Sequence, residues 1–143
     1  MTFKEFSQLF MWGFEGLSVS AETKKLLKQA PSSGVILFKR NIESLSQVKK
    51  LNQSLNQINP GMLIAVDQEG GRVARLTAPF PIYPPAVTWG FLFQKGKNRK
   101  LVVEAGFLLG RELRALGFNL DFAPVLDVIP ILKIRSLVIV LFG

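Results

Sequence analysis

Charged side chains gather directly after one short apolar run, in the stretch IAVDQEGGRVARL. Asp67 follows the apolar run, and a carboxylate there can accept hydrogen bonds from two sugar hydroxyls, bind a metal ion or anchor a loop. Glu69 offers the same choices. The two adjacent glycines allow a sharp turn or a close approach to a ligand. Arg72 and Arg75 can pair with a carboxylate or contact an anionic ligand.

The spacing of these groups leaves two interpretations open. In the first, an ion pair, such as that of Asp67 or Glu69 with Arg72, only fixes the loop, as charged pairs at the ends of elements often do. In the second, the same groups bind a ligand, and Arg72 and Arg75, three positions apart, share one face of a helical turn. The glycine pair is not a nucleotide fingerprint, because it lacks G-x-G-x-x-G and follows two acids that would repel phosphate.

A second pair of carboxylates flanks the segment FNLDFAPVLDV, which predicts a strand. Asp121 lies near the start of this predicted strand, where a role in stability is more usual. Asp127 lies near its end, where a role in a site is expected. Together, Asp67 and Asp127 suggest the paired carboxylates of glycosidic acid–base chemistry, although sequence spacing does not establish their geometry.

The composition limits the chemistry that this chain can perform. A chain of 143 residues with 48% hydrophobic residues is long enough for one domain with a real core. It contains no cysteine, which excludes disulfides and thiolate metal sites. It also contains no histidine, the commonest general base and metal ligand. Catalysis by these residues alone would therefore use Asp, Glu, Lys, Tyr, Ser or Thr.

The net charge of +8 raises the question of a nucleic-acid or membrane partner. The clearest basic cluster comprises Lys95, Lys97, Arg99 and Lys100. No aromatic residue is interleaved with it, so a solvated loop that leads into a helix is favoured over a nucleic-acid surface. The N-terminal residues do not resemble a signal peptide, and no apolar run reaches the ~20 residues that a membrane span needs. A cytoplasmic location without a membrane partner is expected.

Apolar runs alternate with helical patterns along the chain. The predicted strands are residues 9–14, 35–38, 62–66 and 118–128. The predicted helices begin after Ser20, after Ser44 in a capping box with Gln47, and at about Lys100. Unbroken apolar strands argue for a parallel sheet covered by helices. Polar residues follow these strands, at Lys39-Arg40-Asn41, Asp67-Gln68-Glu69 and Asp127, where parallel α/β folds build their sites.

The sequence also predicts which face of each helix is buried. On the first helix, Leu26 and Leu27 lie on the predicted buried face. The second helix has an apolar face with a three-or-four spacing, formed by Leu45, Val48, Leu51, Leu55 and Ile58. The third helix has Leu101, Ala105, Leu108, Leu109 and Leu116 on one side, and Gly117 stands where a helix stop belongs.

Three segments, GVILFKRNIES, LIAVDQEGGRVARL and FNLDFAPVLDV, together resemble the N-terminal part of glycoside hydrolase family 3. They are most similar to the bacterial β-N-acetylhexosaminidases that remove N-acetylglucosamine from peptidoglycan fragments. The similarity covers about Phe10 to Val128. The resemblance implies an α/β fold, the first half of a (β/α)8 TIM-type barrel, truncated here. It also implies a retaining hydrolase with a covalent glycosyl-enzyme and without a metal or organic cofactor.

The resemblance carries substrate contacts to two positions. Asp67 would hold sugar hydroxyls and Arg75 would support the substrate pocket, whereas Glu69 and Arg72 would shape the loop. No catalytic residue is assigned, because the acid/base histidine of a K-H-F-P-G-H-G-type motif and the segment with the aspartate nucleophile are absent. The implied partners are carbohydrate substrates, namely N-acetylglucosamine-containing peptidoglycan fragments. A split enzyme, completed by a complementing C-terminal chain, is a further alternative. We expect this chain to be inactive alone.

Residues 129–143 depart from the family pattern that residues 1–128 follow. The tail reads IPILKIRSLVIVLFG, where the family continues with a sequence like N-S-N-P-x-N-P-V-I-G-D-R-S-F-G. Codons for N-S-N-P-K-N-P-V-I-G-D-R-S, read one base later, can encode residues 129–141 without a mismatch. The hypothesis is a frameshifted tail; the alternative is a genuine strand-and-helix segment. Alternative functions are a non-catalytic carbohydrate-binding remnant and a basic interaction module.

Overall fold

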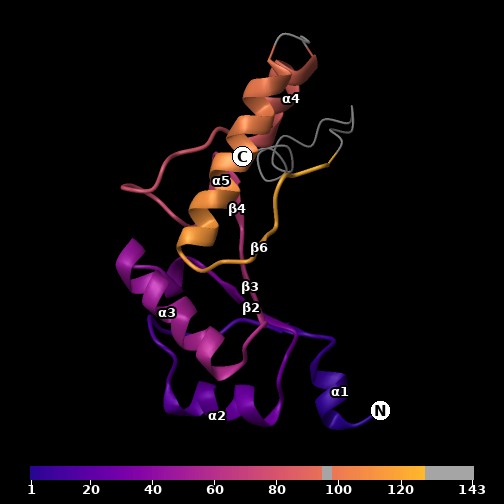
Figure 1. The fold of residues 1–143 in the computed structure, drawn as a ribbon, viewed down its shortest axis with the longest axis vertical. Coiled ribbons are helices and arrows are strands. Elements are labelled where there is room, and N and C mark those ends of the chain that lie inside the picture. Colours follow the sequence, from indigo (N-terminus) through magenta and orange to yellow (C-terminus); the bar gives the residue numbers. More distant parts are fainter. Residues whose placement is uncertain (95–97, 128–143) are drawn as a thin grey trace. The chain divides into compact units, whose positions relative to one another are not determined.

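The computed structural model of the protein describes residues 1–94 and 98–127 (Figure 1). These residues form two compact units. The first comprises residues 1–66 and 112–120, and the second comprises the described residues 67–94, 98–111 and 121–127. The predicted frameshifted tail and two lysines of the basic cluster, Lys95 and Lys97, lie outside the described residues.

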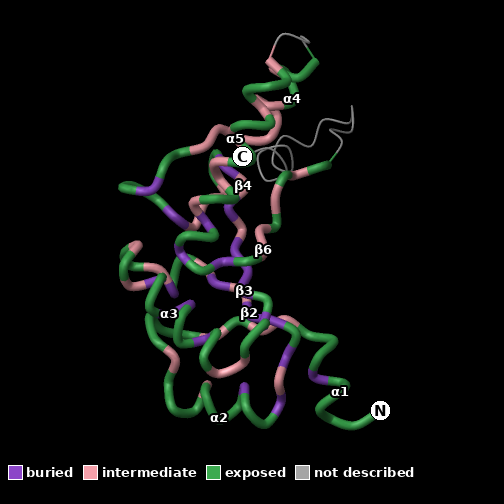
Figure 2. Tube along the Cα trace, in the orientation of Figure 1, coloured by how far each residue is buried: buried purple, intermediate pink, exposed green. Residues whose placement is uncertain are grey.

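A parallel sheet forms the centre of the first unit. Its strands are β1 (Met11–Trp12), β2 (Gly34–Leu37), β3 (Leu63–Val66) and β6 (Leu120–Asp121), in the order β1-β2-β3-β6. β1 pairs parallel with β2, and β2 pairs parallel with β3. Most residues of β2 and β3 are buried (Figure 2), as the unbroken apolar runs predict. The predicted α/β class with a parallel sheet is confirmed.

Side-chain caps fix the starts of the helices in the first unit. α1 (Phe3–Ser7), which the sequence patterns did not predict, is capped by Thr2. α2 (Ala21–Gln29) starts where predicted, because the Ser20 hydroxyl accepts a hydrogen bond from the backbone N–H of Thr23. Leu27 is buried as predicted, but Leu26 is 44% exposed. Adjacent helical positions point about 100° apart, so a narrow contact face holds only one of these leucines.

The longest helix of the first unit, α3 (Leu45–Ile58), confirms the predicted apolar face. Val48, Leu51 and Leu55 are buried, and α3 packs against α2. The Ser44 hydroxyl accepts from the backbone N–H of Gln47, as a cap should. The predicted capping box also requires the Gln47 side chain to accept a hydrogen bond from the backbone N–H of Ser44. This part of the prediction is wrong, because the Gln47 side-chain oxygen accepts from the N–H of Glu43 instead.

A short 3-10 helix, η1 (Lys39–Asn41), follows β2 and holds a buried asparagine. The Asn41 side chain accepts a hydrogen bond from the N–H of Phe38 and donates to the carbonyls of Phe14 and Gly16. The polar group after the second predicted strand therefore fastens the first unit's own backbone.

The helix α5 (Arg99–Ala115) matches the prediction closely, and its last residues belong to the first unit. Leu113, Leu116 and Phe118 are buried there, whereas Leu101, predicted on the same face as Leu116, is 49% exposed. Gly117 ends the helical segment with φ +91°, a conformation that favours glycine. The Asn52 side chain donates to the carbonyl of Leu116.

The second unit contains a hairpin where a helical turn was considered. β4 (Gln68–Gly70) pairs antiparallel with β5 (Val73–Ala74). Gly70 has φ +90°, and a Cβ built on it would collide with the carbonyl oxygen of Pro84. The glycine pair thus serves both the turn and a close backbone approach. Arg72 and Arg75 do not share a helical face.

Two other features of the second unit differ from the sequence patterns. The helix α4 (Ala86–Gln94) was not predicted. Within the described part of the predicted strand 118–128, only Leu120–Asp121 is regular, and residues 122–127 are irregular. Asp121 is therefore the last residue of its strand rather than a residue near the start. No helix in the described part of the chain is long and apolar enough to cross a membrane.

Candidate functional site

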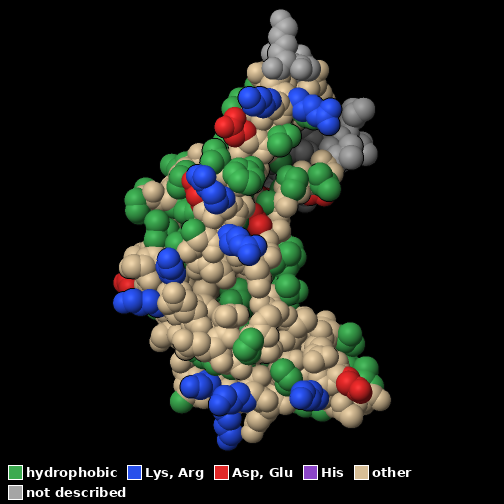
Figure 3. All heavy atoms as spheres, in the orientation of Figure 1, with side chains coloured by type: hydrophobic (Ala, Val, Ile, Leu, Met, Phe, Trp, Pro, Cys, Tyr) green, Lys and Arg blue, Asp and Glu red, His purple; other side chains and the backbone are tan. Residues whose placement is uncertain are grey.

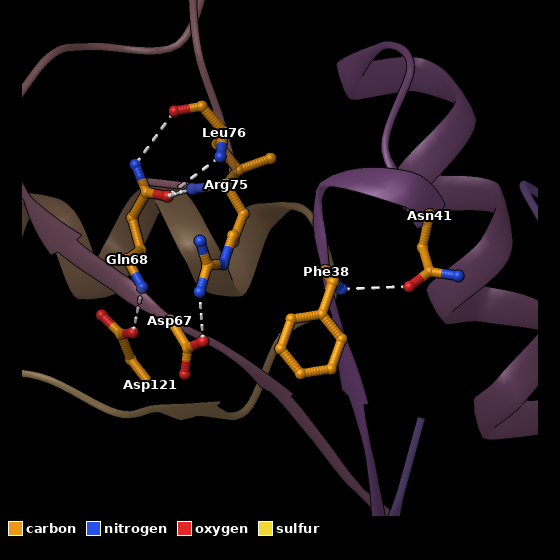
Figure 4. A network of polar contacts seen from close by, with 7 residues as sticks. All are labelled: Phe38, Asn41, Asp67, Gln68, Arg75, Leu76 and Asp121. Carbon is orange, nitrogen blue, oxygen red and sulfur yellow. Dashed lines mark hydrogen bonds and ion pairs between the residues drawn. The ribbon is translucent and has the colours of Figure 1, made fainter. Parts of the chain in front are cut away.

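An ion pair between Asp67 and Arg75 stands directly after β3 (Figure 4). Its Oδ2–Nη2 distance is 2.7 Å, and the two side chains are only 19% and 27% exposed. A short, partly buried, charge-assisted contact holds both groups more firmly than an exposed surface pair does. Within the described residues the other carboxylate oxygen of Asp67 makes no hydrogen bond, so it can accept one from a ligand.

The buried side chain of Gln68 fastens the hairpin that carries Arg75. Its Oε1 accepts hydrogen bonds from the backbone N–H groups of Arg75 at 2.8 Å and Leu76 at 3.0 Å. Its Nε2 donates to the carbonyl oxygen of Leu76 at 3.1 Å (Figure 4). Gln68 is 1% exposed, so these bonds form away from water. Gln68 thereby sets the backbone position from which Arg75 reaches Asp67.

The carboxylate of Asp121 binds the backbone of Gln68. Its Oδ1 accepts a hydrogen bond from the backbone N–H of Gln68 at 2.9 Å. Burial raises the pKa of Asp121 to about 6, and the nearby charges of Asp67 and Glu69 act in the same direction. The hydrogen bond from Gln68 opposes this change because it stabilises the carboxylate.

Glu69 lies beside the ion pair and lines a cavity of about 540 Å³. Burial raises the pKa of Glu69, and the charge of Asp67 adds to the effect while that of Arg75 opposes it. Within the described residues, Glu69 forms no hydrogen bond or ion pair. A carboxylate left without such a partner is available to a ligand.

The structure brings together two of the charged groups that the sequence singled out and leaves others apart. Asp67 pairs with Arg75, whereas Arg72 is exposed and forms no ion pair in the described part of the chain. An ion pair at this loop is thus present, as the structural interpretation expected, but its cation is Arg75 and not Arg72. Asp127 is exposed, and among the described residues nothing joins it to Asp67.

Two residues that organise the site were not assigned from the sequence. Gln68 had one available signal, an amide side chain embedded between two acids directly after a buried strand. Asp121 was noticed but assigned to stability, because its predicted strand was too long. Across residues 1–94 and 98–127, no group of Asp and Glu side chains is arranged to hold a metal ion.

The family model for the glycosyl hydrolase family 3 N-terminal domain matches residues 1–132. The chain belongs to glycosyl hydrolase family 3. The match covers both Asp67 and Arg75, so this ion pair lies within the segment that matches the family's N-terminal domain.

Known family 3 proteins resemble the chain in sequence and in structure. It is 40% identical over 120 residues to a β-hexosaminidase of Thioalkalivibrio sulfidiphilus, covering 82% of this chain and 35% of the relative. A solved structure of NagZ from Neisseria gonorrhoeae, in complex with N-trifluoroacetyl-D-glucosamine, has a TM-score of 0.71 and 33% identity over 82% of this chain and 36% of that chain.

A family 3 β-N-acetylglucosaminidase from a Paenibacillus strain has a TM-score of 0.79 and 38% identity. That alignment covers 90% of this chain and 24% of the Paenibacillus chain. The chain thus spans about a third of the length of the curated relatives that it matches. The resemblance to the N-terminal part of β-N-acetylhexosaminidases is confirmed.

Proposed function

We propose that this chain contributes one wall of the sugar subsite of a β-N-acetylhexosaminidase. Asp67 accepts hydrogen bonds from hydroxyls of N-acetylglucosamine, and Arg75 holds the carboxylate in the orientation that receives them. The observation that carries the proposal is the partly buried ion pair at 2.7 Å, placed directly after a parallel strand. The relative crystallised with N-trifluoroacetyl-D-glucosamine supports the choice of sugar.

The catalytic groups of the proposed enzyme lie outside these residues. The 143 residues contain no histidine, so the acid/base that the family resemblance implies must come from a complementing C-terminal chain or segment. The proposed substrates are N-acetylglucosamine-containing peptidoglycan fragments, hydrolysed with retention. A cytoplasmic location is part of the proposal, and fractionation of cells that express the chain tests it.

Calorimetric titration of the full chain with N-acetylglucosamine tests the binding role. Asp67→Asn and Arg75→Gln should each weaken binding by about tenfold, because each removes a charge-assisted contact worth roughly 1.5–3 kcal/mol. Arg72→Gln is the matched control, since it removes a nearby arginine that is exposed and forms no ion pair among the described residues. Equal loss of affinity in all three variants, or in none, would contradict the assignment.

The same titration separates the proposal from its two alternatives. A non-catalytic carbohydrate-binding remnant would bind the sugar through Asp67 but gain no activity when a C-terminal family 3 segment is added. A basic interaction module would bind nucleic acid with a steep salt dependence and ignore the Asp67 substitution. We favour the enzyme subsite because its wall is built from a fixed, partly buried pair.

A further inference from the structure

A cavity in the second unit has a lining unlike the rest of this basic chain. It has a volume of about 540 Å³, which lies within the usual range for small-molecule pockets. Its walls come from the β4 strand, α4, the first part of α5 and residues 121–126. Apolar atoms dominate these walls, and Trp89 and Phe93 contribute aromatic surface.

The charged residues in the described lining of this cavity are all acidic. Among the residues that the structure describes, Glu69 and Asp121 are the only acidic or basic ones that line it, in a chain whose net charge is +8. Lys and Arg side chains are scattered over the face drawn in Figure 3, but no Lys or Arg of residues 1–94 and 98–127 lines the cavity. The charges of Asp67 and Asp127 also act on Glu69, and Arg75 is the opposing cation. The cavity therefore combines an apolar body with negative charge.

The state of the two carboxylates fits a missing positive partner. Glu69 forms no hydrogen bond or ion pair within the described residues, although it is partly buried. Burial raises the pKa of both Glu69 and Asp121, which means that removal from water costs their charged forms free energy. A cation in the cavity would offset that cost.

The aromatic walls suit the same kind of ligand. The indole N–H of Trp89 donates to the carbonyl oxygen of Pro84, which fixes the ring against the wall. The Phe93 ring already has the guanidinium carbon of Arg99 at 6.0 Å from its centroid. Trp89 therefore offers the more suitable face for a further cation.

We propose that this cavity binds an amphiphilic organic cation, with the ammonium group at Glu69 and Asp121 and the apolar body against Trp89 and α5. The proposal goes beyond the sugar subsite and does not depend on it. Three ligands of similar shape but different charge separate the contribution of charge to binding from that of hydrophobic contact. They are the cation phenylpropylammonium, the neutral phenylpropanol and the anion phenylpropionate. Trp89 reports on their binding in a Trp12→Phe background, where it is the only tryptophan.

Titration of this single-tryptophan protein should give saturable changes in Trp89 emission. Phenylpropylammonium should bind about fivefold more tightly than phenylpropanol, the ratio expected from one partly exposed ion pair. Phenylpropionate should bind least. Glu69→Gln should abolish the preference for the cation, whereas Glu104→Gln, which removes a carboxylate of α5 outside the lining, should keep it.

Several results would overturn the proposal. Equal affinity for the three ligands would make the cavity a purely apolar site, and no response to any of them would mean that the cavity is closed or already filled. A preference for the cation that survives Glu69→Gln would place the charge recognition elsewhere. If Trp12→Phe does not fold, calorimetry on the wild-type chain and the Glu69→Gln variant makes the same comparison.

Discussion

At the scale of single residues, one buried amide connects most of the candidate site. Gln68 supplies three side-chain hydrogen bonds to the segment that carries Arg75, and its backbone N–H reaches Asp121. An amide can donate and accept at once, and this double ability is what the opposing N–H and carbonyl groups of Leu76 require. Neither an acid nor an aliphatic side chain meets all of these demands.

Replacement of Gln68 by methionine tests this role. The change keeps the side chain's length but leaves two N–H groups and one carbonyl without their partner. We expect the free energy of unfolding to fall by about 2–4 kcal/mol in urea titrations, because unsatisfied buried polar groups are costly. Gln53→Met, at an exposed position of α3, should change it by less than about 0.5 kcal/mol. Similar losses for both variants would refute the role.

The carboxyl of Asp121 gives the stability a pH dependence. Burial raises its pKa from 3.8 to about 6, so between these values the folded chain binds more protons than the unfolded chain. Stability should therefore fall as the pH rises from about 4 to 6, by roughly 1–2 kcal/mol once solvent screening is taken into account.

Asp121→Asn should remove much of this slope, because the amide oxygen still accepts from Gln68 but does not titrate. The raised pKa of Glu69 contributes a slope of the same sign, which the variant keeps. Urea unfolding at several pH values measures the difference. Glu104→Gln changes the charge outside this group and should keep the wild-type slope; an unchanged slope in Asp121→Asn would refute the assignment.

At the scale of elements, the hairpin depends on backbone geometry that only glycine adopts cheaply. Gly70→Ala would place a methyl group against the carbonyl oxygen of Pro84 at φ +90°. We expect a loss of about 2 kcal/mol or more in stability, measured by thermal unfolding. Gly106→Ala is the matched change inside α5, where a Cβ meets nothing within 4 Å, and should add about 1 kcal/mol. Equal effects of the two changes would contradict this geometry.

Local patterns predicted the elements whose signals are strong. α3 has both a serine cap and an apolar face, and β2 and β3 are unbroken apolar runs, so their positions followed from the sequence. α4 was missed because AVTWGFLFQ is apolar on all sides and contains a glycine, which hides any helical period. The β4–β5 hairpin was missed because its strands are too short to show alternation.

The candidate site was only partly predictable for a related reason. Asp67 and Arg75 were assigned through the family resemblance, whereas spacing alone left Arg72 as an equal partner. The choice between the two arginines depends on the Gln68 side chain, whose Oε1 accepts a hydrogen bond from the backbone N–H of Arg75 and so places Arg75 rather than Arg72 at Asp67. Such a choice arises from tertiary geometry and leaves no periodic trace.

At the scale of the whole molecule, the chain spans about a third of the length of its curated relatives. We expect no release of nitrophenol from a nitrophenyl N-acetylglucosaminide by the purified chain, because its 143 residues contain no histidine. Addition of a C-terminal family 3 segment should restore the release of nitrophenol if the two parts assemble. Turnover by the chain alone would contradict the proposed division of the catalytic groups.

The frameshift hypothesis concerns residues 129–143, which lie outside the described part of the chain. The nucleotide sequence across codons 125–145 tests it. A one-base shift that restores N-S-N-P and G-D-R-S would support the hypothesis, and an intact frame without those motifs would refute it.

The most direct test of the sugar subsite is a nuclear magnetic resonance titration of the labelled chain with N-acetylglucosamine. The account predicts amide shifts concentrated in residues 67–76, around the Asp67–Arg75 pair, and their loss in Asp67→Asn. Shifts that lie elsewhere, or that persist unchanged in Asp67→Asn, would contradict the central claim that this ion pair forms a wall of the sugar subsite.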